Sequence, residues 1–188
     1  AAKSEVSRAN DLSAQKDGMS EAIQTVTAAS KGIDAISTLI DSAKGIAQAA
    51  LATSDTTQRA QYVTQYNAVI SQINSLASDS GYRGTNLLIG NTLAVKFNED
   101  GSSSLSIVGF NATASGLAIG LGSAWASSTD SINSALTELT GASSTLRVQA
   151  SSLSSSLSVV QTRSDWADQM IATLKAGAGK LTDTDMNE

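Results

Sequence analysis

The sequence predicts a mainly α-helical protein, an elongated antiparallel bundle that forms a coiled-coil-like rod and carries one small β-hairpin. Apolar residues recur every third or fourth position over two long stretches, the 188 residues include no proline, and only 4% are aromatic. Small Ala and Ser side chains bury little area each, which disfavours a thick globular core and suits helices packed along narrow seams. We expect one domain over residues 1–188, with helices at about 5–52, 56–79 and 130–180 and a hairpin and loop at about 90–129.

The first helix is predicted by a long apolar stripe. Its members lie three or four positions apart, so they share one face of a helix. They are Met19, Ala22, Val26, Ala29, Ile33, Ile36, Ile40, Ala43, Ala47 and Ala50. Their mean spacing is close to the roughly 3.5-residue period of coiled coils, so a second long helix is expected to pack on them.

A shorter helix is predicted after a turn at 52–55. The polar cluster at 54–57 supplies good N-caps, and the segment 79–81, which ends in Gly, is a plausible C-terminal stop. The apolar stripe of this helix consists of Tyr62, Tyr66, Val69, Ile73 and Leu76.

Beyond residue 90 the apolar period changes from about 3.5 to 2, which is typical of strands. The alternating residues are Leu93, Val95 and Phe97, and then Leu105 and Ile107. Between the two runs, residues 98–101 end in an Asp-Gly step, a strong hairpin signal. We predict a β-hairpin here, followed by a Gly-, Ser- and Ala-rich loop at 111–130 in which Trp125 packs on the hairpin.

The last helix is predicted to start near residue 130, with Thr129 or Asp130 as its N-cap. Its stripe consists of Ile132, Leu136, Leu139, Ser143, Leu146, Ala150, Leu153, Leu157, Val160, Ser164, Ala167, Ile171, Leu174, Ala178 and Leu181. At 1.5 Å per residue this stretch is about 70–75 Å long, so the molecule should be a rod with both chain ends at one end.

Composition excludes much chemistry. The chain has no His and no Cys, which removes the commonest general base, the commonest metal ligand and any thiolate nucleophile. No Gly-rich loop leads into a Lys and a Ser or Thr. We therefore expect no enzymatic activity and no cofactor. A net charge of −5 disfavours nucleic-acid binding, and no apolar run approaches the ~20 residues needed to cross a membrane.

Residues 59–90 resemble the flagellin signature, in which an Arg opens a helix with a repeated Q-x-x-x-I-D pattern that ends at a corner with Asn-Gly and Leu-Leu. The matching positions are Arg59, Gln65, Tyr66, Asn67, Gln72, Ile73, Leu76, Ala77, Tyr82, Gly84, Asn86, Leu87 and Leu88. Two positions depart from it: Asn74 stands where the family usually has Asp, and Arg83 where it usually has Asn. Residues 174–188, which end in Asp-Met-Asn-Glu, are similar to the end of the flagellin C-terminal core, and 12–50 match its N-terminal core helix more loosely.

The resemblance implies the core of a bacterial flagellin without its terminal polymerisation segments, of the short type of some α-proteobacteria. Such a protein is a secreted, extracellular structural subunit that self-assembles into the helical flagellar filament for motility. Its implied partners are other flagellin subunits, an export chaperone, and filament-cap and junction proteins, while this fragment alone should be monomeric. Two alternatives stay open: a hook–filament junction protein, and a flagellin-like surface adhesin or polysaccharide receptor.

Polar residues away from the seams are candidates for contacts between subunits, because a filament needs two complementary faces whose rotation does not close into a ring. The candidates are Asp34, Asp41, Arg147, Arg163, Asp165, Trp166 and Asp168, with Arg59 and Lys175 as further charges. The charged residues could instead be ordinary solvated helix charges, and for Trp166 we favour a position at the flank of the core. At the corner, Gly84 should take a positive φ or admit a close backbone, and Asn86 should bond to its local backbone.

Overall fold

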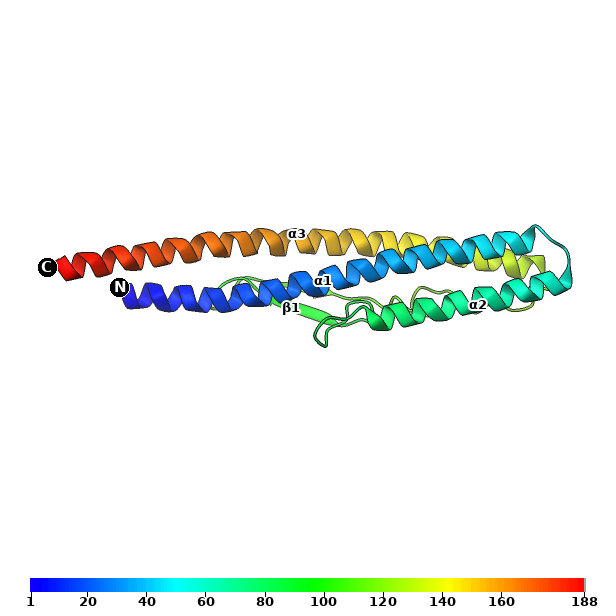
Figure 1. Cartoon of the computed structure of the whole chain (residues 1–188), viewed down its shortest axis with the longest axis horizontal. Coiled ribbons are helices and arrows are strands. Elements are labelled where there is room, and N and C mark those ends of the chain that lie inside the picture. Colours follow the sequence, from blue (N-terminus) through cyan, green and yellow to red (C-terminus); the bar gives the residue numbers. More distant parts are fainter. Residues whose placement is uncertain (188) are drawn as a thin grey trace.

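The computed structural model describes the backbone of residues 1–187 and the side chains of residues 1–181. Three helices, α1 (Ala2–Leu51), α2 (Thr56–Asp79) and α3 (Thr129–Asn187), and two strands, β1 (Thr92–Lys96) and β2 (Ser104–Val108), follow one another along the chain. Helices α2 and α3 both pack on α1, and the two chain ends lie at the same end of the rod (Figure 1). The predicted fold class is therefore confirmed.

The long helices extend beyond the expected bounds, because nothing in 2–4 or 181–187 breaks a helix. With 59 residues, α3 is about 88 Å long. The side chains of the Asp-Met-Asn-Glu run at 185–188 lie outside the described residues. Within the described part, no helix combines the length and apolarity needed to cross a membrane.

The two predicted seams meet along the rod. All ten members of the first stripe are buried in α1. Along α3, buried members such as Leu139, Leu146 and Leu153 alternate with half-buried ones such as Leu136 and Leu157, and only Leu181 is exposed. A stripe that alternates in this way is what a 3.5-residue repeat produces when one helix packs along a single seam.

Polar caps fix where α2 and α3 begin. The Asp55 side chain accepts a hydrogen bond of 2.9 Å from the Gln58 amide, as expected of an N-cap. The α3 cap differs from the prediction: the Ser128 hydroxyl accepts from the Ser131 amide at 3.2 Å, so neither Thr129 nor Asp130 is the cap. The helix begins one residue earlier than its apolar stripe suggested.

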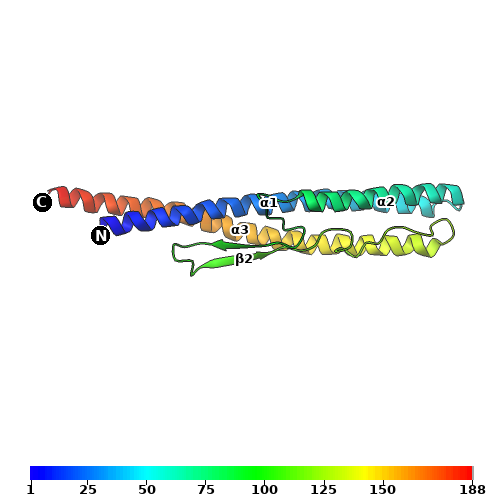
Figure 2. The same ribbon diagram turned by 90° about the horizontal axis from the view of Figure 1, so that it is seen from below.

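The hairpin and the loop fill the side of the rod (Figure 2). Strands β1 and β2 pair antiparallel from Thr92 with Val108 to Lys96 with Ser104, and they bury Val95 and Ile107. The loop buries Trp125, but against the Tyr66 ring of α2, with the ring centroids 4.8 Å apart. The expectation that Trp125 packs on the hairpin is wrong, because the loop runs back along α2.

Candidate assembly interface

Arg59, the first residue of the signature, is buried and forms hydrogen bonds within its own chain. Only 9% exposed, it donates from Nε to the carbonyls of Ala50 (3.2 Å) and Thr53 (2.8 Å), and from Nη1 to the Thr129 hydroxyl (3.2 Å). It thereby joins the end of α1 and the α1–α2 turn to the start of α3. Its charge is used inside the subunit, so the suggestion that Arg59 contacts a neighbouring subunit is wrong.

Two asparagines of α2 hold the loop in place. The Asn67 side chain exchanges two hydrogen bonds with the Gly122 backbone, donating to its oxygen at 3.1 Å and accepting from its nitrogen at 2.7 Å. The Asn74 Oδ1 accepts from the Ala114 amide at 2.8 Å. An Asp at position 74 could accept the same bond, so this departure from the signature keeps the contact.

Asn86 closes the C-terminal end of α2. Its Nδ2 donates to the carbonyls of Ala77 (2.8 Å) and Ser78 (3.1 Å), which belong to the last turn of the helix; the Ala77 carbonyl also accepts from the Ser80 amide at 3.5 Å. Its Oδ1 accepts from the Leu88 amide at 2.8 Å, which is the expected bond to local backbone. Leu88, like Leu87 and Ile73, is fully buried.

The corner itself is a tight turn. Tyr82 and Thr85 exchange both backbone hydrogen bonds, and the two residues between them have positive φ, 48° at Arg83 and 83° at Gly84. This is the type I′ geometry that favours Asn-Gly. No described atom lies within 4 Å of where a Cβ on Gly84 would sit, so Gly84 serves the backbone conformation and not a close approach. The Arg83 side chain forms an exposed ion pair with Glu21 at 2.8 Å.

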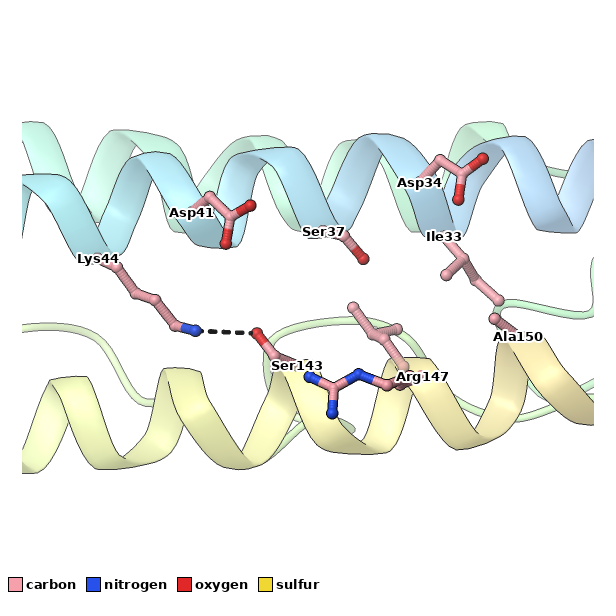
Figure 3. Close-up of a pocket in the computed structure, with 9 residues that line it drawn as sticks. Ile33, Asp34, Ser37, Asp41, Lys44, Ser143, Arg147 and Ala150 are labelled. Atoms are coloured by element: carbon pink, nitrogen blue, oxygen red, sulfur yellow. Dashed lines mark hydrogen bonds between the residues drawn. The ribbon is translucent and has the colours of Figure 1, made fainter.

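Three of the predicted contact residues come together in one groove between α1 and α3 (Figure 3). Asp34 and Asp41 line it from α1 and Arg147 from α3, and the groove has a volume of about 340 Å³. Lys44 reaches across it to the Ser143 hydroxyl at 3.3 Å. Within the described residues none of the four forms an ion pair, so both signs of charge remain available to a partner.

The other predicted contact residues are arranged differently. The Arg163 guanidinium lies between the Phe97 and Trp166 rings, 4.9 and 4.8 Å from their centroids, and Asp168 pairs with Lys16 of α1. Trp166 is 36% exposed, so our favoured interpretation of it as a flank of the core is wrong. It lies one position from the buried Ala167, and one helical step turns a side chain by about 100°. Asp165 is exposed.

The hairpin tip is tied to both long helices. Phe97 covers Arg163 of α3, and the Glu99 carboxylate accepts a hydrogen bond from Arg8 of α1. This bond is the main cause that lowers the pKa of Glu99 below its usual value. The tip therefore braces the two helices near the end of the rod where the chain termini lie.

Two exposed faces carry no charge, a feature that the sequence analysis missed. The α2 face consists of the exposed residues of 60–78, which are Ala60, Gln61, Thr64, Gln65, Ala68, Ser71, Gln72, Asn74, Ser75 and Ser78. The α3 face consists of the exposed residues of 148–162, which are Val148, Ser151, Ser152, Ser154, Ser155, Ser158, Val159, Gln161 and Thr162. Residues 60–78 and 148–162 contain no Asp, Glu, Lys or Arg, which is visible in the sequence and could have indicated both faces.

These faces share with interface cores the absence of Lys, Glu and Asp, although they are rich in Ser and Ala, in which interface cores are depleted. Interface cores are depleted in Lys, Glu and Asp relative to the remaining surface, because covering an unpaired charge is costly. Val148 is 66% exposed and Val159 42%, so the α3 face also offers apolar area. In the described part of the chain, no group of three or more His, Cys, Asp or Glu side chains could hold a metal ion.

Comparison with known proteins identifies the fold. No protein-family model matches the chain, and no curated protein matches it. Among solved structures, the chain is similar to the crystal structure of Bacillus cereus flagellin, with a TM-score of 0.70 and 14% identity, over 80% of this chain and 88% of that one. The chain therefore has a flagellin-like fold.

Proposed function

We propose that this protein is a structural subunit of a bacterial flagellar filament, of a short type with little beyond the helical core. The observation that carries the proposal is the fold shared with a flagellin over most of both chains. The rod shape and the two uncharged faces support it. On this proposal the protein is secreted and extracellular, and its partners are other copies of itself together with an export chaperone, the filament cap and junction proteins.

We infer how neighbouring subunits meet. The α2 face and the α3 face belong to two different helices that both pack on α1, so contact of one face with the other joins unlike surfaces. A contact of unlike surfaces whose rotation does not close produces an open helical assembly. The charged groove with Asp34, Asp41 and Arg147 lies between α1 and α3, where Arg147 directly precedes Val148 of the α3 face, and complementary charges there would fix the register between subunits.

Immunogold electron microscopy of cells tests the proposed function. Antibodies raised against this chain should label the flagellar filament along its whole length. Label confined to the base of the filament would favour the hook–filament junction protein. Label spread over the cell body with bare filaments would favour the adhesin or polysaccharide receptor, and would contradict the proposal.

A charge placed in the α2 face tests the inferred contact. Gln65→Glu in the full-length protein should abolish filaments, because an unpaired carboxylate covered by a neighbour costs several kcal/mol, and each 1.4 kcal/mol weakens association about tenfold. Gln24→Glu adds the same charge at an exposed position of α1 outside both faces and is the control. Both purified variants should melt at the wild-type temperature. Normal filaments from Gln65→Glu would refute this contact while leaving the filament function standing.

A further inference from the structure

Trp166 is the one aromatic side chain that the rod leaves exposed. The other six aromatic residues are buried or half-buried, whereas Trp166 is 36% exposed. Its ring is held in place, because the Arg163 guanidinium stacks on it at 4.8 Å and is covered on its other side by Phe97. Trp and Arg are enriched among the residues that carry the binding energy of protein interfaces, and a side chain that is already ordered loses little freedom on binding.

Trp166 continues the uncharged α3 face. It lies 18 residues after Val148 and seven after Val159, which correspond to about five and about two turns of a helix. The three side chains therefore lie along one side of α3, and all three are exposed. A partner that covers the α3 face and extends along the helix reaches Trp166 as well.

A shallow depression on α1 can receive this ring. It lies between residues 14–24 of α1 and the corner residues Tyr82 and Arg83, which follow the end of α2, and its volume is about 690 Å³. Gly18 is one of the lining residues, and no described atom lies within 4 Å of where a Cβ on Gly18 would sit, so the space next to it is open. No residue of α3 lines the depression, so the depression and Trp166 belong to different helices.

The two surfaces carry complementary charges. Within the described residues, neither Asp17 in the depression nor Arg163 beside Trp166 forms an ion pair. A second pair of opposite sign consists of Asp165, which is exposed, and Arg83, whose side chain is 68% exposed even in its ion pair with Glu21. Complementary charges around an apolar contact favour one orientation and disfavour others.

Trp166 and the depression lie at about the same level of the rod. Lys16 of α1 pairs with Asp168 of α3, and the two helices are antiparallel, so Gly18 and Trp166 are displaced from this pair by two residues in the same direction. Subunits related by a rotation and a shift along one axis all point the same way. Two such rods side by side with little axial shift therefore bring Trp166 of one copy next to the depression of the other.

We propose that Trp166 of one subunit docks into the depression around Gly18 of a second copy of this chain, with Arg163 and Asp165 facing the opposite charges that line it. The proposal rests on the proposed filament function. It extends the contact between the α2 and α3 faces by one aromatic anchor.

Acrylamide quenching of tryptophan fluorescence tests the proposal without any change to the contact. Trp125 is 1% exposed, so quenching in the free subunit reports on Trp166, and Trp166→Phe identifies its signal. In filaments of the full-length protein, the quenching of Trp166 should fall severalfold and its emission should shift to shorter wavelengths. Unchanged quenching in well-formed filaments would overturn the proposal and leave the filament function standing. Absence of filaments from the wild-type protein would contradict both.

A matched pair of variants tests the depression. Gly18→Leu fills it, and the purified variant should melt at or above the wild-type temperature because Leu is the better helix former and meets no described atom at its Cβ. In the full-length protein this variant should form no filaments. Gly45→Leu makes the same change at an exposed position of α1 outside the depression and both faces, and should assemble normally. Normal filaments from Gly18→Leu, or equal loss in both variants, would overturn the role of this depression.

Discussion

Gly32 lies where α1 crosses the end of α2, and its replacement by Ala should destabilise the rod although Ala is the better helix former. A Cβ at this position would lie 2.6 Å from Leu88 Cδ1, 2.8 Å from Ser80 Cβ and closer still to Ser80 Oγ. Leu88 is fully buried, and the Ser80 hydroxyl bonds to the Leu76 carbonyl, so neither can yield without loss. Overpacking of this kind costs about 1–3 kcal/mol and the lost hydrogen bond about 1, against roughly 1 gained in helix propensity. The net destabilisation is about 1–3 kcal/mol, which lowers Tm by roughly 3–10 °C in a chain of this length.

Gly45 provides the matched control for this prediction. It lies in the same helix, is exposed, and has no described atom within 4 Å of an added Cβ. Gly45→Ala should therefore raise Tm by about 1–4 °C. Ser80→Gly removes two of the three clashing atoms, so the double variant Gly32→Ala/Ser80→Gly should lose less stability than the two single changes added together. Thermal unfolding followed by circular dichroism measures all four proteins, and equal Tm shifts for Gly32→Ala and Gly45→Ala would refute the reasoning.

Three further predictions concern the hydrogen bonds that hold the helices together. Arg59→Leu removes the side-chain donor to the carbonyls of Ala50 and Thr53 and to the Thr129 hydroxyl, and should lower the free energy of unfolding in urea by about 2–4 kcal/mol. Arg147→Leu on the surface should change it by less than about 0.5 kcal/mol. Asn86→Ala removes the side-chain cap at the C-terminal end of α2 and should lower the free energy of unfolding by about 2 kcal/mol in the same titration. A decrease of less than about 0.5 kcal/mol would show that water replaces the amide. The bond from Arg8 lowers the pKa of Glu99, so its stabilisation is present above the unfolded pKa and disappears as the pH falls through the folded value. The Tm of Glu99→Gln should accordingly lie below that of the wild type near pH 7 and coincide with it at roughly pH 2.5, with a small difference because Arg8 is largely exposed.

The sequence predicted the helices, their seams and the hairpin because each of these is encoded by a repeating pattern. The ten apolar residues of α1 are buried because a spacing of three and four residues can only place them on one face. Trp166 shows the limit of this inference. It directly precedes the seam residue Ala167 in the sequence. The Ala167 side chain is buried, whereas the Trp166 side chain stacks on Arg163 at the surface.

Other parts of the fold depend on contacts without any period. The path of the loop is set by the side chains of Asn67 and Asn74, whose partners lie 55 and 40 residues away in the chain. Nothing in the local sequence tells where these amides bond, so the position of Trp125 could not be predicted. Arg83 could be read only as a departure from Asn-Gly; its φ of 48° shows that the turn type persists without the preferred residue.

Buried and exposed positions of the signature serve different purposes: the buried ones hold the fold together, and exposed ones such as Gln65 lie in the proposed contact face. The polar groups of Arg59, Asn67 and Asn86 are occupied by hydrogen bonds to backbone atoms of their own chain. These residues therefore contribute to folding and have few hydrogen-bonding groups free for a neighbouring subunit. The exposed Gln, Ser and Thr side chains of the α2 and α3 faces have the reverse property, because replacing one on an isolated rod changes few internal contacts. Folding and assembly should then respond to different substitutions. A change at Asn86 lowers stability whether or not subunits associate, and a charge at Gln65 blocks association in a rod that melts normally. If a charge at Gln65 instead lowered Tm as much as Asn86→Ala does, this face would be part of the folding core and the assignment of the two roles would fail.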